Sequence, residues 1–116
     1  MRREGFEVAR KGGETACARL AHFFPQATPV RIPVQVSRLN AATAAAAEQT
    51  MIEFGTSAEV LFASALPLEF EDKIQVRNSD GTFDVKAEIV AMQLDQGTRA
   101  VAARFLQNVA NWIIKQ

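Results

Sequence analysis

The sequence predicts a mainly β domain, a small antiparallel barrel or sandwich with a short helix near each end. Several short segments alternate apolar and polar residues with a period of two, as strands do when one face is buried. Turn-forming residues separate these segments at regular spacing. A chain of 116 residues can bury about two thirds of its surface around a single core without disulfides or metals. The expected strands are residues 30–37, 50–54, 59–63, 73–77, 83–91 and 101–105.

The strands differ in how clearly the sequence marks them. Pro33 has no N–H for a ladder hydrogen bond, so we expect the first strand to lie at an edge or to carry a bulge. Residues 59–63 are more continuously apolar than the others. The second half is clearest, because residues 78–81 (NSDG) and 95–97 (DQG) indicate turns.

Two stretches have the spacing of an amphipathic helix. Positions i, i+3 and i+7 hold Cys17, Leu20 and Phe24 in residues 14–24, and Leu106, Val109 and Ile113 near the end of the chain. Pro25 ends the first pattern. Residues 40–48, mostly alanine, are compatible with two helical turns capped by Asn40 or with a loop of small residues. We therefore divide the chain into a flexible arm (1–13), a helix with its connection (14–28), and a barrel with a closing helix (29–116).

Composition excludes several classes of function. The 13 basic residues balance the 13 acidic ones, which argues against a nucleic-acid-binding surface. One cysteine and one histidine leave neither an internal disulfide nor a zinc cluster, so no metal and no cofactor is expected. No apolar run approaches the roughly 20 residues that span a bilayer. With no secretory signal at its start, the chain is expected to be cytoplasmic and not inserted in a membrane.

The central segment, residues 50–76, resembles the centre of PilZ domains. It runs through a strand, a serine-containing turn and an apolar strand, followed by residues 66–74 (LPLEFEDKI), which are similar to the family's Pro-Leu…Gly-Asp-x-Val entry to the next strand. Residues 31–36, 87–92 and 100–106 resemble other strands of the family. The resemblance covers roughly Pro29 to Ile114. It implies a six-stranded antiparallel barrel with a terminal helix, and a regulatory function linked to cyclic di-GMP in bacteria.

Family members bind cyclic di-GMP through two motifs, and this chain departs from both. The resemblance places the Arg-x-x-x-Arg motif near Phe23 and Ala27, and no two arginines of the chain are four residues apart. In the [Asp/Asn]-x-Ser-x-x-Gly motif, Gly55 stands where Asp or Asn is expected, Ser57 keeps the serine and Val60 replaces the glycine. Loss of two arginine contacts at about 1.5–3 kcal/mol each weakens binding by roughly two to four decades.

Protein contact is the alternative use of such a domain. Phe23 and Phe24 are adjacent, so a short helix cannot turn both equally well towards the core. Trp112 is expected either to cap one mouth of the barrel or to anchor a partner. The candidate contact residues are Leu20, Phe23, Phe24, Trp112 and Ile113.

The sequence offers no convincing catalytic site. Ser57 has no base near it in the chain and is expected to be a turn serine that bonds the local backbone. His22 and Cys17 do not share a helical face, so they form neither a catalytic pair nor a metal site. We therefore expect no enzyme activity.

These features lead to three hypotheses for function. The first is a non-catalytic PilZ-like adaptor that acts through contacts with another protein or with itself. The second is a cyclic di-GMP receptor with a noncanonical site built from Arg31, Ser57 and the basic residues of the arm (Arg2, Arg3, Arg10 and Lys11). The third is a purely structural oligomerisation module.

Overall fold

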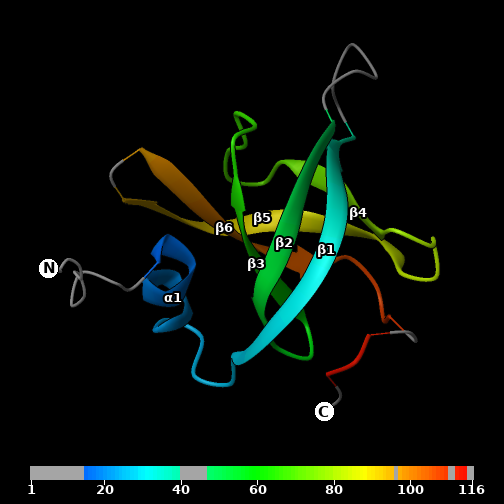
Figure 1. Ribbon diagram of the computed structural model, residues 1–116, viewed down its shortest axis with the longest axis horizontal. Coiled ribbons are helices and arrows are strands. Elements are labelled where there is room, and N and C mark those ends of the chain that lie inside the picture. Colours follow the sequence, from blue (N-terminus) through cyan, green and yellow to red (C-terminus); the bar gives the residue numbers. More distant parts are fainter. Residues whose placement is uncertain (1–14, 40–46, 96, 110–111, 115–116) are drawn as a thin grey trace, which may run out of the picture.

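The computed structural model describes residues 15–39, 47–95, 97–109 and 112–114. These residues form one helix and six strands: α1 (Ala16–Ala21), β1 (Thr28–Arg38), β2 (Ala47–Gly55), β3 (Glu59–Ser64), β4 (Lys73–Asn78), β5 (Asp84–Asp95) and β6 (Thr98–Phe105). The strands close into an antiparallel barrel in the order β1-β2-β3-β6-β5-β4 (Figure 1). The expected six-stranded barrel with a short helix on its N-terminal side is confirmed.

Two separate cores hold the fold together. Inward-facing side chains of all six strands fill the barrel, with Phe62, Ile52 and Ile74 among the largest that are fully buried. A second, smaller core lies outside the barrel wall, where α1 packs on β3, β5 and β6. Because β3 and β6 are buried on both faces, their alternate residues face opposite cores. In β3, Val60 and Phe62 face the barrel core and Leu61 faces the second core. This explains the continuously apolar sequence of β3.

The helix α1 is shorter than the predicted stretch 14–24. It is capped by Thr15, whose Oγ1 accepts a hydrogen bond from the amide of Ala18 at 3.0 Å. It ends at Ala21, four residues before Pro25. Cys17 and Leu20 are buried against the barrel wall, as their spacing predicts. Arg19 forms an ion pair of 3.2 Å with Asp95 and so joins the helix to the end of β5.

The predicted closing helix is wrong for the described residues after β6. Residues 106–109 and 112–114 are not helical. Helical spacing would bury Leu106, Val109 and Ile113 on one face, but Leu106 and Ile113 are exposed, while Val109, Ile114 and Trp112 pack on the barrel core. In the described residues 106–109 and 112–114, burial at the barrel end therefore follows no helical period.

The structure also tests the predictions about the first strand, the turns and the alanine-rich segment. The register of β1 against β2 shifts between Pro29 and Ile32, so β1 is irregular near Pro33, but Pro33 itself pairs in register with Met51. The ladder with β4 begins at Val34, directly after Pro33. The turns at 78–81 and after Asp95 separate β4, β5 and β6 as expected. Of the alanine-rich segment, residues 47 and 48 belong to β2, whereas residues 40–46 lie outside the described part of the chain, as does the arm 1–13.

Candidate functional site

The turn between β2 and β3 is the position that the resemblance assigns to ligand binding, and it is tightly bonded to itself. The hydroxyl oxygen of Thr56 accepts hydrogen bonds from the amides of Ala58 (3.0 Å) and Glu59 (2.9 Å), and the hydroxyl donates to the Glu59 carboxylate. The Thr56 amide donates to the Glu59 carbonyl at 2.9 Å. Thr56 is 6 % exposed. The turn is therefore a preformed structure whose polar groups are largely satisfied internally.

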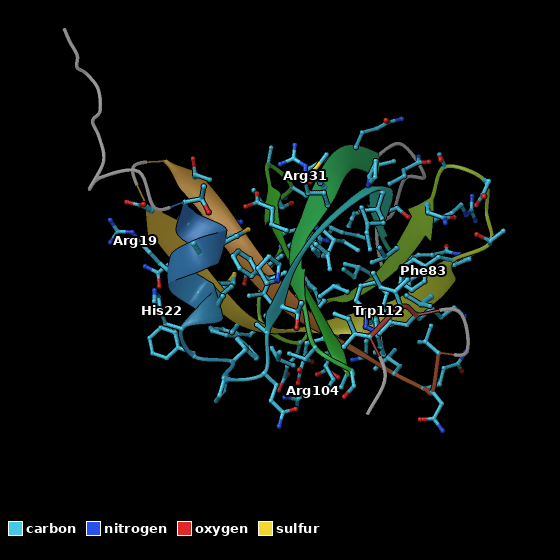
Figure 2. The ribbon with its side chains drawn as sticks, turned by 60° about the horizontal axis from the view of Figure 1, so that its bottom comes forward. Arg19, His22, Arg31, Phe83, Arg104 and Trp112 are labelled. Atoms are coloured by element: carbon cyan, nitrogen blue, oxygen red, sulfur yellow. The ribbon has the colours of Figure 1, made fainter. Side chains whose placement is uncertain are left out.

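Trp112 covers this turn from the inside of the barrel. Its Nε1–H donates to the Thr56 carbonyl at 2.6 Å, and the indole is 2 % exposed. The ring packs on Phe83 and Phe105, with centroids 5.2 and 5.6 Å away (Figure 2). Phe83 precedes β5 and Phe105 ends β6, so Trp112 closes the barrel end where β2 finishes and β3 begins. Capping of one barrel mouth, the first of its two expected roles, is what the structure shows.

Gly55 has no room for a side chain unless the indole moves. A Cβ built on Gly55 would lie 2.6 Å from Cζ2 of Trp112, which is closer than such atoms pack, and 3.0 Å from Cδ1 of Ile114, which is a tight contact. The resemblance expects an Asp or Asn at this position. Here the space that such a side chain would occupy belongs to the indole.

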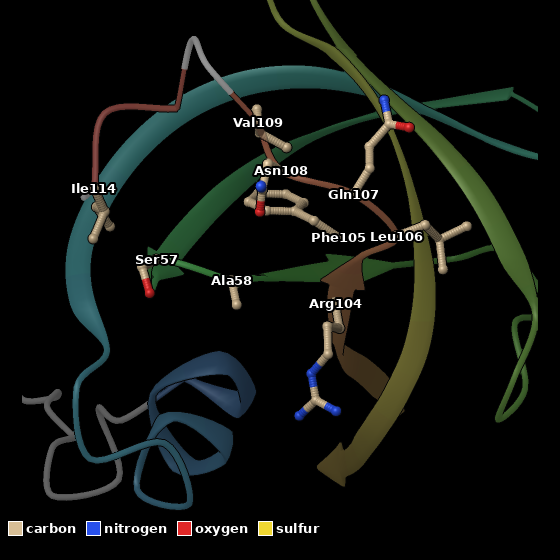
Figure 3. Close-up of a pocket in the computed structure, with 9 residues that line it drawn as sticks. All are labelled: Ser57, Ala58, Arg104, Phe105, Leu106, Gln107, Asn108, Val109 and Ile114. Carbon is tan, nitrogen blue, oxygen red and sulfur yellow. The ribbon is translucent and has the colours of Figure 1, made fainter. Parts of the chain in front are cut away.

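A shallow groove runs beside the turn on the outer side. Its volume is about 490 Å³, and Figure 3 shows it between the β2–β3 turn and the segment after β6. Residues lining it include Ser57, Ala58, Arg104, Gln107 and Asn108. The Arg104 guanidinium forms an ion pair with Glu59 at 3.0 Å, so a ligand phosphate would have to compete with this carboxylate for it. The groove offers hydroxyl and amide groups, which suit a polar contact better than a doubly charged phosphate ligand.

The structure does not bring the predicted ligand residues together. Ser57 lines the groove beside the turn, whereas Arg31 is exposed on β1 and lines a different cavity, of about 600 Å³, between α1 and β1–β2. That cavity also contains the carboxylate of Glu53. Val60, at the motif's glycine position, is fully buried in the barrel core. Among the four predicted positions, Arg31 and Ser57 alone have accessible side chains.

The predicted protein-contact residues divide into two sets. Leu20 and Trp112 are each 2 % exposed and belong to the two cores, so neither can anchor a partner. Phe24 is half-buried against the second core. Phe23 (73 % exposed) and Ile113 (64 %) present their side chains to solvent. Of the five candidate contact residues, Phe23 and Ile113 are therefore the two with exposed side chains.

Sequence reasoning missed several residues that shape the site. Thr56 and Glu59 form the bonded turn, and their Thr-x-x-Glu spacing is the signal that reveals such a pairing. Arg104 is held by Glu59 across the β3–β6 ladder, where the two residues are direct neighbours. Phe70 and Leu94, 61 and 67 % exposed, were not singled out, because isolated apolar residues in loops and at strand ends give no periodic signal.

The thiol of Cys17 is the most strongly perturbed titratable group. Burial raises its pKa to about 12, and the nearby Glu53 carboxylate adds to the rise through its charge and a hydrogen bond from the thiol. A thiol held protonated is a poor nucleophile. In the β4–β5 turn, hydrogen bonds from the backbone and hydroxyl of Thr82 lower the pKa of Asp80. Within the described residues no three His, Cys, Asp or Glu side chains gather as a metal site.

Comparison with known proteins shows a likeness to a solved structure. No family model matches the chain, and no curated protein matches it. Among solved structures, the fold is similar to that of the Bacillus subtilis inhibitor of motility (MotI/DgrA), with a TM-score of 0.51 and 13 % identity. The alignment covers 72 % of this chain and 42 % of that one, so this chain spans less than half of that protein's length.

This likeness concerns architecture. It supports a PilZ-like fold, and at 13 % identity it carries no residue of a site from one protein to the other. In the part of the chain that the structure describes, no helix combines the length and apolar character needed to cross a membrane.

Proposed function

We propose that the protein is a non-catalytic PilZ-like adaptor domain that acts through protein contacts and binds cyclic di-GMP weakly or not at all. The setting proposed is bacterial regulation linked to cyclic di-GMP, in the cytoplasm. Control of motility is one such process, and the solved structure of similar fold is named an inhibitor of motility.

The observation that carries the proposal is the position of Trp112 on the β2–β3 turn. A ligand bound in the family's manner needs an acidic or amide side chain at position 55 and a glycine at position 60. Position 55 has no room beside the indole, and position 60 is a barrel-core valine. The nearest arginine of the groove, Arg104, is paired with Glu59. The turn thus serves to close the barrel, which leaves the outer surface for protein contacts.

Isothermal titration of the purified chain with cyclic di-GMP tests the proposal, at low salt and near-physiological salt. We expect no heat of binding at tens of micromolar ligand. Saturable binding near micromolar affinity would overturn the proposal and favour the receptor hypothesis. In that case, deletion of residues 1–13 and the variant Arg31→Ala would show whether the arm or Arg31 supplies the missing charge.

Protein contact is tested with the exposed residues of the expected surface. Phe23→Lys replaces an exposed aromatic ring, and Ser79→Lys adds the same charge in the exposed β4–β5 turn as a matched control. A partner recovered from an extract of the source cells, or self-association measured by sedimentation, should be weakened by Phe23→Lys and unchanged by Ser79→Lys. Equal effects of the two variants would remove Phe23 from the contact surface.

A further inference from the structure

The second half of β5 leaves one of its edges without a neighbour. The ladder between β4 and β5 ends at the pair Lys73 and Glu88. Ile89 then exchanges two hydrogen bonds of 2.9 Å with the backbone of Glu71 and Asp72. Beyond Ile89, residues 91–95 pair with β6 alone among the described residues, and Val90 lies at a register shift in that ladder. Figure 1 shows the β5–β6 hairpin running out past the barrel, alongside α1. We call residues 90–95 of β5, on the side away from β6, the β5 edge.

The β5 edge lacks most of the features that usually prevent pairing with another strand; the exception is a register shift against β6 at its start, between Ile89 and Ala91. Natural edge strands carry lysine or proline, or are covered by another element. Residues 90–95 (VAMQLD) contain neither residue. Helix α1 packs on the face of the hairpin that contains Ala91, Ala100 and Ala102, which leaves the edge itself uncovered. The outward backbone groups of this edge are therefore available to an incoming strand.

An apolar groove lies directly beside this edge, on the face opposite α1. Its volume is about 500 Å³, and its lining includes Pro67, Phe70, Met92 and Leu94. Phe70 and Leu94 are 61 and 67 % exposed, two of the largest exposures of apolar side chains in the described part of the chain. The loop that forms the far wall is held in place by Arg99, whose guanidinium donates to the carbonyls of Leu66 and Leu68, each at 3.2 Å. The groove is thus a preformed feature of the surface.

The charges around the groove select a basic occupant. Glu69 and Glu71 are exposed on the wall loop, and neither forms an ion pair within the described residues. Arg99, the cation that lines the groove, is held by two neutral carbonyls and keeps its positive charge, so the two carboxylates of the wall loop exceed it by one negative charge. A segment with lysine or arginine beside its apolar residues would complement this rim.

A second copy of the chain fits the β5 edge poorly. Symmetric antiparallel pairing centred between Met92 and Gln93 would set Asp95 of each copy opposite Val90 of the other. Asp95 is already paired with Arg19. Residues 90–95 contain no lysine or arginine, so the paired strand of a second copy would place no basic side chain beside Glu69 and Glu71.

We propose that the β5 edge binds an extended segment of a partner protein, with apolar residues at alternate positions and flanking basic residues. The segment adds a strand to the β5–β6 hairpin through backbone hydrogen bonds, and its apolar side chains enter the groove between Phe70 and Leu94. The inference rests on the proposed function in one respect, namely that the domain acts through protein contacts. It places the contact on a different surface from Phe23 and Ile113.

The test uses a random dodecapeptide display library selected on the full chain. Enriched peptides should alternate apolar and basic residues, and synthetic copies should bind with shifts in the amide NMR signals of residues 90–95. Leu94→Lys, which adds a charge at the β5 edge, should weaken binding at least tenfold. Ser79→Lys, which adds the same charge in the exposed β4–β5 turn, is the matched control and should leave binding unchanged. Methylation of the peptide nitrogens whose N–H groups face β5 should abolish binding. Methylation of the nitrogens that alternate with them should preserve binding.

Three outcomes would overturn the inference. The first is that the library enriches no peptide whose binding is weakened by Leu94→Lys. The second is that enriched peptides still bind whichever set of alternate backbone nitrogens is methylated. The third is that the chain associates with itself and that Leu94→Lys abolishes this association. Enriched peptides sensitive to Phe23→Lys alone would overturn the β5 site and leave the proposed adaptor function standing. Micromolar binding of cyclic di-GMP in the titration would overturn the proposed function without moving the peptide result.

Discussion

The indole of Trp112 packs directly on Gly55, although the two residues are 57 positions apart in the chain. The indole lies where a side chain on residue 55 would be, since a Cβ there would come within 2.6 Å of Cζ2. The same indole donates a hydrogen bond to the carbonyl of the next residue, Thr56. The large ring at position 112 therefore packs at the barrel end because residue 55 has no side chain, and the two residues together close that end.

The first prediction tests this arrangement by a double-mutant cycle. Gly55→Ala forces the added methyl into the indole, and overpacking of this kind costs about 1–3 kcal/mol. In the background of Trp112→Ala the same substitution should cost less than half as much, because the obstructing ring is gone. Urea unfolding of the four proteins measures both values.

The cycle also separates the packing explanation from a backbone explanation. Gly55 is not among the glycines with positive φ, so an added methyl at this position meets the ring without strain in the backbone itself. Equal destabilisation by Gly55→Ala in both backgrounds would show that the two residues are not coupled. An introduced Asp at position 55 should fail to create cyclic di-GMP binding for the same steric reason.

The second prediction concerns the indole N–H. Trp112→Phe keeps an aromatic ring beside Phe83 and Phe105 but removes the donor to the buried Thr56 carbonyl. An acceptor left without a partner costs about 1–3 kcal/mol, beyond the small loss of apolar area. Chemical denaturation should show this loss, and amide NMR signals of residues 56–59 should shift. Unchanged stability, or unchanged signals in the turn, would contradict the role given to this hydrogen bond.

The third prediction compares two arginines with different partners. Arg99 donates to two carbonyls of the loop after β3, whereas Arg104 is 57 % exposed and pairs with Glu59. Arg99→Met removes both loop bonds and should destabilise the protein by about 1–3 kcal/mol. Arg104→Met should cost less than about 1 kcal/mol, because exposed ion pairs contribute little. Thermal unfolding orders the two variants, and the reverse order would overturn the role of Arg99 as the anchor of the loop.

The strands were predictable because each has at least one buried face that follows a period of two. In β4, Ile74 and Val76 point into the barrel, while Gln75 between them and Arg77 after them are more exposed. Even β3, with both faces buried, was recognisable by its length and apolar content. Strand ends were less predictable: β2 begins at Ala47, in a run of alanines that has no polar residue to alternate with.

The barrel end and the candidate site could not be read from local patterns. The spacing of Leu106, Val109 and Ile113 is helical, but burial after β6 is decided by contacts with the barrel end. Trp112 must reach Thr56, and a local pattern does not record a contact across 56 positions. For the same reason, the sequence shows only that Gly55 stands where the family has a ligand-binding residue. The structure shows in addition that the indole of Trp112 packs against this glycine.

The last prediction uses the buried thiol of Cys17. Its pKa is raised from 9.0 to about 12, first by burial and then by Glu53. Between these values the unfolded chain has released the thiol proton and the folded chain still holds it, so unfolding releases a proton. Stability should therefore be unaffected by this group below about pH 9 and should fall as the pH rises from there towards 12.

Urea unfolding as a function of pH checks this slope, with Cys17→Ala as the control. The chain has no tyrosine, and the lysines titrate alike in both proteins, so the difference between the two curves isolates the thiol. The native thiol should also react slowly with Ellman's reagent at pH 8 and rapidly in denaturant, because Cys17 is 1 % exposed. Parallel stability curves for the two proteins, or fast reaction in the native state, would show that Cys17 is not held as a buried, protonated thiol.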